Sequence, residues 1–225
     1  MIDAIQVVIN GLLVGLVYGV VAVSFIVIYR SSRIVNLAQG EIVLVAAFFI
    51  WTFTLAAGLS PAIGVPLALL ACVALGFSLE RSIFRPLIGQ PAFTIFMASV
   101  ALLILLRGLA QLVWGAETRP FPELLPPGAW RLGPFLVNKR LLIGAVLTIA
   151  AVELLHWFFM RTRYGLRLAA VAEDHYTALS LGVSVRKAVA AGWIMGALLG
   201  AVGATVLLSG QIVSLSAANI GLRAL

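Results

Sequence analysis

Charge is scarce in this sequence. Lys, Arg, Asp and Glu together make up 10% of its 225 residues, whereas apolar residues make up 63% and the mean hydropathy is +1.14. A soluble domain carries roughly a quarter charged residues, so this composition excludes an ordinary soluble protein and predicts a protein that crosses the lipid membrane several times. The net charge of +7 comes from basic residues scattered between apolar runs. Without a basic stripe interleaved with aromatics, it does not indicate a nucleic-acid partner.

Residues that form disulfides or bind metals are also few. The sequence has one cysteine, Cys72, inside an apolar run, and two histidines, His156 and His175. Neither a disulfide framework nor a thiolate metal site can be built from this set. There is also no G-x-S-x-G nucleophile motif and no pair of catalytic carboxylates. The sequence therefore predicts neither an enzyme nor a bound cofactor.

Six apolar runs predict membrane-spanning helices. They cover residues 5–29, 42–57, 62–79, 93–114, 141–160 and 188–208. A helix needs ~20 apolar residues to cross the hydrocarbon core, so the second run is short and is expected to begin earlier, near Leu37. The predicted fold class is all-α, a polytopic transmembrane helical bundle of about six spans in one domain, residues 1–225.

The distribution of basic residues predicts the orientation, because cytoplasmic loops are enriched in Lys and Arg. One side receives Arg30, Arg33, Arg81, Arg85, Arg161, Arg163, Arg167, Arg186 and Lys187, and the other receives Arg107, Arg119, Arg131, Lys139, Arg140 and Arg223. The larger set indicates an N-terminus outside, the 161–187 loop in the cytosol and the 115–140 loop outside. Arg107 lies inside a span and is expected to extend along the lipid to the outer interface.

Two of the apolar runs carry glycines at four-residue spacing. These are Gly11, Gly15 and Gly19 in the first run and Gly192, Gly196 and Gly200 in the last. Residues four apart share one helix face, and small residues allow membrane helices to approach closely. Both seams are therefore predicted helix-packing surfaces. They indicate either ordinary tight packing or two helices that pack together and slide during a transport cycle.

A polar segment separates the first two runs. It contains Asn36, Gln39, Gly40 and Glu41, directly before a long apolar stretch. An ionised residue at the bilayer centre costs at least ~2.5–3.5 kcal/mol. Glu41 is therefore either a solvated residue that opens the second helix, where the helix dipole favours it, or part of a broken element that lines a translocation path.

Glu153 and His156 lie three residues apart in the fifth run and share a helix face. They are interpreted as a hydrogen-bonded structural pair, with a proton relay as the alternative.

The 161–187 loop has its own helical pattern. Glu173 and Asp174 precede a turn that includes Ala178 and Leu179, and Gly182 is suited to end it. Ser184 can cap the next helix. The product would be a short helix across the cytoplasmic mouth. The alternative is an amphipathic helix resting on lipid, but its acidic pair would be repelled by an anionic leaflet.

Several segments in order resemble the permease family of bacterial ABC importers for branched-chain amino acids, urea and short amides. They are Asn10-Gly11-Leu12-Leu13 through Gly19, Asn36-Leu37-Ala38-Gln39-Gly40-Glu41, Glu80-Arg81 through Arg85-Pro86-Leu87, Gly115, Thr162-Arg163-Tyr164-Gly165-Leu166-Arg167, Ala178 through Val183, and the glycine-rich last run. The resemblance covers essentially the whole chain. Family members continue past the position of Leu225, so a fragment, a truncated gene or a short form is expected.

The resemblance implies a transport subunit without its own ATPase site. Its implied partners are cytoplasmic ABC ATPase subunits, a periplasmic substrate-binding protein, a sister permease or second copy, and membrane lipid. It also implies an ATPase-coupling segment, formed by Glu173, Asp174, Ala178, Leu179 and Gly182. Two alternatives stay open: a proton-coupled secondary transporter with Glu41 or Glu153 carrying protons, and an inactive truncated permease.

Overall fold

The computed structural model describes residues 2–32, 35–173, 178, 180 and 182–218. Within this part of the chain, six helical segments are long and apolar enough to cross a membrane: Ala4–Ser32, Gln39–Ala56, Pro61–Leu87, Ala92–Trp114, Lys139–Arg161 and Val185–Leu208. The predicted all-α bundle is therefore confirmed. The second span begins at Gln39, close to the expected Leu37.

Two of the spans change helix type along their length. Helix α1 covers Ile2–Ser32, and α2 (Gln39–Trp51) continues as a π-helical turn, η1 (Thr52–Ala56). Likewise α3 (Pro61–Leu79) continues through the π-helical turn η2 (Glu80–Phe84) into the 3₁₀ turn η3 (Arg85–Leu87). The remaining helices are α4 (Ala92–Trp114), α5 (Lys139–Arg161), α6 (Arg163–Glu173), α8 (Val185–Leu208) and the 3₁₀ turn η4 (Leu215–Ala218).

The connection from α4 to α5 forms a small cap at one end of the bundle. Strand β1 (Arg119–Pro120) pairs antiparallel with β4 (Ile212–Val213), and β2 (Ala129–Leu132) pairs antiparallel with β3 (Phe135–Asn138). The hydroxyl oxygen of Ser209 accepts hydrogen bonds from the backbone N–H groups of Leu124 and Leu125, at 3.0 and 2.8 Å. These bonds hold the connection against the end of α8.

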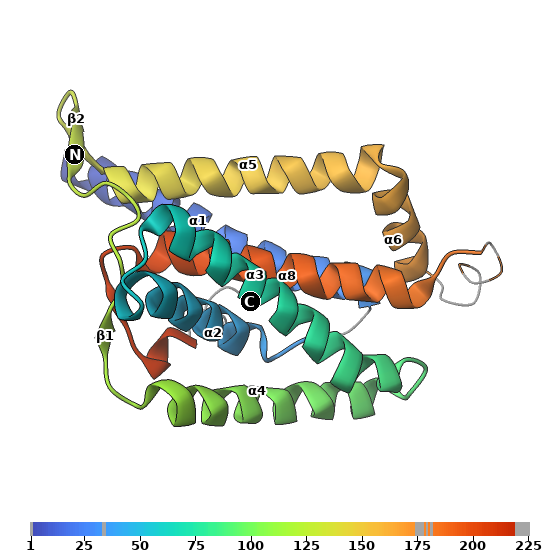
Figure 1. Cartoon of the computed structure of the whole chain (residues 1–225). Helices are drawn as coiled ribbons and strands as arrows, with labels where there is room; N and C mark the ends of the chain where they lie inside the picture. Colours follow the sequence, from blue (N-terminus) through green and yellow to red (C-terminus); the bar gives the residue numbers. More distant parts are fainter. Residues whose placement is uncertain (1, 33–34, 174–177, 179, 181, 219–225) are drawn as a thin grey trace.

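Helix α8 lies in the middle of the bundle. It packs against α1, α2 and α3, whereas α5 packs mainly on α1, and α4 lies at the opposite edge beside α2. Figure 1 shows this order, with α6 crossing one end of the bundle from α5 toward α8 and the strands at the other end. The connection at residues 115–138 and helix α6 therefore lie at opposite ends of the spans.

The glycine seam of α8 packs against α1 and α2. A Cβ atom at Gly196 would lie 2.5 Å from Cγ1 of Ile28, and one at Gly200 would lie 3.4 Å from Nε2 of Gln39. At Gly192 a Cβ atom would overlap Ser31. Gly192 and Gly196 thus let α8 approach α1 more closely than a side chain would allow, whereas the distance at Gly200 is an ordinary contact.

The glycine seam of α1 faces the other way. A Cβ atom at Gly19 would lie 3.5 Å from Cγ2 of Thr148 on α5, and at Gly11 and Gly15 it would meet nothing within 4 Å. The two seams therefore do not meet each other, although α1 and α8 are neighbours. Within the described chain, Gly11 and Gly15 line open space.

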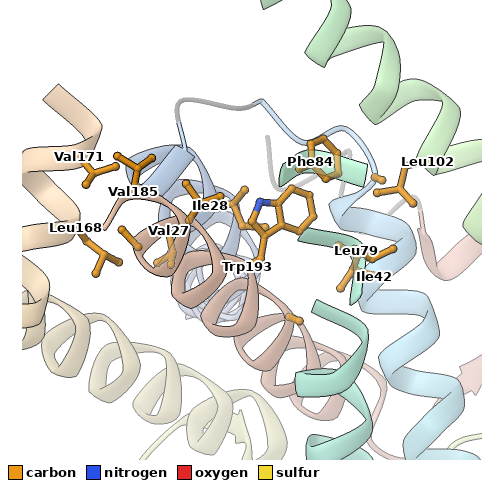
Figure 2. Packing of buried hydrophobic residues seen from close by; sticks show 14 of the residues in the cluster. Val27, Ile28, Ile42, Leu79, Phe84, Leu102, Leu168, Val171, Val185 and Trp193 are labelled. Carbon is orange, nitrogen blue, oxygen red and sulfur yellow. The ribbon is translucent and has the colours of Figure 1, made fainter. Parts of the chain in front are cut away.

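An aromatic stack anchors the core at the α6 end of the bundle. The rings of Phe84 and Trp193 are stacked at 4.2 Å between centroids, with 26° between their planes, and both side chains are fully buried. Figure 2 shows this stack among apolar residues from α1, α2, α3 and α4. The stack joins the π-helical end of α3 to α8.

Candidate functional site

The polar segment between α1 and α2 lies inside the bundle. Residues 35–38 are not helical, and the Oδ1 atom of Asn36 accepts a hydrogen bond from the backbone N–H of Ala38 at 3.1 Å. The Nδ2 of Asn36 donates to Oε1 of Gln39 at 3.4 Å. Asn36, Gln39, Gly40 and Glu41 are all buried. Figure 1 shows that the chain turns back after α1 and that α2 begins part-way along the bundle.

Gln39 links three helices. Its Nε2 donates to the hydroxyl of Ser24 on α1 at 2.8 Å and to the backbone carbonyl of Gly196 on α8 at 3.0 Å. Because a buried amide without partners would cost free energy, these bonds fix the start of α2 against α1 and α8.

Glu41 forms an ion pair with Arg107 on α4. The Arg107 Nη2 to Glu41 Oε1 distance is 2.6 Å, and the two side chains are 41% and 2% exposed, respectively. Arg107 is seven residues before the end of α4 at Trp114, which is about 10 Å along the helix axis. The pair therefore lies at membrane depth and ties the start of α2 to α4.

One of the two alternatives for Glu41 and the expectation for Arg107 are wrong at this pair. Glu41 is not a solvated residue at a helix start, because the re-entry of residues 35–38 buries the first turn of α2. Arg107 does not extend along lipid to the outer interface, because its guanidinium is bonded to Glu41. Each partner nevertheless keeps one buried atom without a hydrogen bond in the described chain, Oε2 of Glu41 and Nε of Arg107.

A groove runs between α1 and α5. Its volume is about 730 Å³, and it is lined by the α1 glycines Gly11, Gly15 and Gly19 and by α5 residues that include Thr148 and Glu153. The carboxylate of Glu153 is exposed there, and His156 is exposed one turn further along α5. No hydrogen bond joins them among the described residues, so the expected structural pair is wrong.

The segment after α5 turns sharply into α6. The backbone N–H of Gly165 donates to Oγ1 of Thr162 at 3.0 Å. A Cβ atom at Gly165 would lie 2.6 Å from Cα of Phe159 and would overlap the carbonyl of Phe158. Leu168 and Val171 on α6 are buried in the core that contains Trp193. The close backbone contact at Gly165 therefore sets how α6 lies across the bundle end.

The predicted coupling residues are only partly described. Ala178 is buried, its carbonyl accepts from the backbone N–H of Val183 at 2.9 Å, and Gly182 has φ +74°. Asp174 and Leu179 lie outside the described residues, as does the side chain of Glu173. Ser184 precedes α8 at the N-cap position, but its side chain makes no capping hydrogen bond.

The comparison with known families identifies the chain. Residues 7–224 match the family described as the branched-chain amino acid transport system / permease component. The chain belongs to this family. Its six apolar spans agree with a multi-pass permease of the bacterial inner membrane. No solved structure matched the chain.

Curated relatives of this permease carry the same description. The high-affinity branched-chain amino acid transport system permease protein BraD of Pseudomonas aeruginosa is 26% identical over 215 residues, which cover 90% of this chain and 70% of BraD. The corresponding proteins LivH of Salmonella typhimurium and Escherichia coli are each 24% identical over 211 residues, covering 88% of this chain and 68% of each relative. The resemblance inferred from the sequence motifs is confirmed.

The permease contains a second ion pair with a buried glutamate, which the sequence did not reveal. The Nε and Nη2 atoms of Arg85 donate to the two carboxylate oxygens of Glu80 at 3.0 and 2.7 Å, and Glu80 is fully buried. The five-residue separation would place the two side chains on different faces of a regular α-helix. They meet because the chain between them is a π-helical turn. The sequence shows the two charges but not the change of helix type.

Metal binding finds no support in the described part of the permease. Across residues 2–32, 35–173, 178, 180 and 182–218, no group of three His, Cys, Asp or Glu side chains could hold an ion. What the site offers is charge and hydrogen bonding at membrane depth, at Gln39 and at the Glu41–Arg107 pair.

Proposed function

We propose that this permease forms the translocation path for branched-chain or related amino acids. The observation that carries the proposal is the re-entrant start of α2, where Asn36, Gln39, Gly40 and Glu41 are buried between α1, α4 and α8. Polar and charged groups inside membrane spans are costly and typically mark substrate pathways. Broken helices that begin at membrane depth are a recurring element of transporter sites.

The proposed partners follow from the family. Cytoplasmic ATPase subunits would dock at the end of the bundle where α6 and the start of α8 lie. A substrate-binding protein would dock at the opposite end, at residues 115–140, and a sister permease or second copy would complete the path. The excess of Lys and Arg near α6 supports a cytosolic location for that end, with the N-terminus outside.

The proposed coupling segment comprises Glu173, Asp174, Ala178, Leu179 and Gly182. Buried contacts of Leu168 and Val171 connect α6 to the core around Trp193, so movement of the segment would be transmitted to α8. Hydrolysis would take place in the ATPase subunits, and the permease would convert their closure into a change of the path.

Substitution of Gly182 tests the coupling assignment. Gly182 has φ +74°, a conformation that costs a β-branched residue about 1–2 kcal/mol. We expect Gly182→Val to lower leucine uptake and substrate-stimulated ATPase activity several-fold, with an unchanged amount of permease in the membrane. The measurement is radiolabelled leucine uptake in permease-deficient cells that also supply the ATPase and binding-protein subunits.

Gly58→Val is the matched control. Gly58 also has a positive φ, +65°, and a Cβ atom there would meet nothing within 4 Å, but it lies in the connection at the other end of the bundle. Its uptake should stay near that of the unsubstituted chain. Equal losses in both variants would refute the coupling role. Uptake that survives ATP depletion, collapses with an uncoupler and is lost in Glu153→Gln would instead support a proton-coupled transporter.

A further inference from the structure

Among the described residues, two ion pairs contain a buried glutamate, and they are built differently. Glu80 and Arg85 make a bidentate pair in which both carboxylate oxygens are bonded. Glu41 and Arg107 are joined through one oxygen and one terminal nitrogen, and Glu41 Oε2 and Arg107 Nε have no partner among the described residues. The first pair lies within one span, Pro61–Leu87, and leaves no carboxylate oxygen unbonded. The second retains hydrogen-bonding capacity for another group.

The exposure of Arg107 gives a second reason. Its side chain is 41% exposed, although it lies within a membrane-spanning helix. A guanidinium at this depth is tolerated where it faces water or protein and not where it faces lipid tails. The exposed part of Arg107 is therefore expected to lie against water or a protein partner and not against lipid tails, next to a carboxylate that is itself 2% exposed.

The start of α2 also bears on the charges at this place. The first N–H groups of a helix have no partner inside the helix, and the helix dipole favours an anion at this end. Gln39 and Gly40 form this first turn at the depth of the ion pair. Glu41 is the third residue of this turn, so its own carboxylate already lies at the positive end of the helix. The charges of the pair themselves favour a carboxylate near Arg107 and an ammonium group near Glu41.

We propose that Glu41 and Arg107 bind the charged ends of the transported amino acid, with Arg107 on the α-carboxylate and Glu41 on the α-ammonium group. The proposal rests on the proposed translocation function and names the recognised chemistry as an α-amino acid zwitterion. Such a ligand exchanges one ion pair for two and leaves the net charge at zero. A ligand with one charge would leave an uncompensated charge at membrane depth, which is costly.

Analogues with one charge each test this assignment. Radiolabelled leucine binding would be measured on the full chain in lipid nanodiscs, with competition by leucinamide, which lacks the carboxylate, and by 4-methyl-2-oxopentanoate, which lacks the ammonium group. Both should compete at least tenfold more weakly than leucine, since a hydrogen bond to a charged group corresponds to a factor of about ten or more. Glu41→Gln should remove the penalty against the keto acid, and Arg107→Gln the penalty against the amide.

The controls separate binding from structure. Arg107→Lys keeps a positive charge and should keep part of the penalty against leucinamide that Arg107→Gln removes. Glu153→Gln alters the exposed carboxylate in the α1–α5 groove. It should change neither the affinity ratio of leucine to leucinamide nor that of leucine to the keto acid. A merely structural pair would weaken all three ligands alike. Absence of saturable leucine binding, or unchanged ratios in Glu41→Gln and Arg107→Gln, would overturn the inference. Either result alongside normal ATP-dependent uptake would leave the translocation function standing.

Thiol labelling provides a measurement that does not depend on affinity. In a Cys72→Ala background, Arg107→Cys should react with a charged, membrane-impermeant thiol reagent. Leu105→Cys should not react. Leu105 is also exposed, at 50%, and lies at similar depth, but it is two residues away and so on roughly the opposite face of α4, where lipid is expected. Arg107→Cys leaves the Glu41 carboxylate without its partner, which could disturb the fold. Repeating the labelling of both cysteine variants in a Glu41→Gln background controls for this effect. Equal labelling at both positions, or none at position 107, would refute an aqueous space at Arg107.

Discussion

Gly165→Ala is expected to abolish most leucine uptake while the permease still reaches the membrane. The added Cβ would lie 2.6 Å from Cα of Phe159 and would overlap the carbonyl of Phe158. Both neighbours are backbone atoms of α5, so no side chain can rotate away and the corner between α5 and α6 must open. Overpacking of this kind typically costs 1–3 kcal/mol. We expect uptake to fall tenfold or more, because α6 would no longer hold the proposed coupling segment in place.

Uptake and membrane content, measured together, check this result. Gly11→Ala is the matched control, since it adds the same methyl group at a position where a Cβ meets nothing within 4 Å. Gly11→Ala should retain normal uptake. Normal uptake by Gly165→Ala would show either that the corner tolerates the methyl group or that the position of α6 does not matter for transport. Thermal unfolding in detergent distinguishes these cases, since only the first predicts an unchanged midpoint.

Trp193→Ala should lower the stability of the bundle by about 3–5 kcal/mol, the cost of removing a large buried aromatic side chain. Trp193 is fully buried and stacked on Phe84, so its loss would detach the π-helical end of α3 from α8. Trp193→Phe should cost much less, because it keeps an aromatic ring against Phe84. The indole Nε1 has no hydrogen-bond partner among the described side chains and backbone, so losing it removes no bond.

Unfolding of the purified permease in mixed micelles measures both variants. The alanine variant should unfold at a distinctly lower denaturant concentration, and the phenylalanine variant should remain close to the unsubstituted chain. If the two variants were equally destabilised, the indole nitrogen would have to make a bond that the aromatic stack does not account for.

The spans were predictable because membrane crossing imposes a length and a composition on each helix. Even the short second span could be extended to its start, since a run beginning at Ile42 was too short to cross. The family resemblance was likewise readable from motifs spread along the chain. Both features depend on local sequence, which needs no knowledge of how the helices are arranged.

The side-chain contacts inside the bundle were not predictable in the same way. Glu41 and Arg107 are distant in sequence, and each had a reasonable separate interpretation at a helix start or a lipid interface. Their pairing depends on the re-entry of residues 35–38, which carries α2 back to membrane depth. Similarly, equal glycine spacing in α1 and α8 could not show that one seam contacts helices and the other lines a groove. Glu153 and His156 share a helix face, but sequence spacing does not create a hydrogen bond.

The neutrality of the Glu41–Arg107 pair has a consequence for energetics across the membrane. Voltage acts on net charge, at about 2.3 kcal/mol per elementary charge per 100 mV. Helices α2 and α4 carry their opposite charges at the same depth, 2.6 Å apart, so the field exerts almost no net force on the pair when the two helices move together. A zwitterion held between these side chains would also cross this point without electrical work. Conformational change here would then depend on chemical energy supplied by partner subunits and not on the membrane potential.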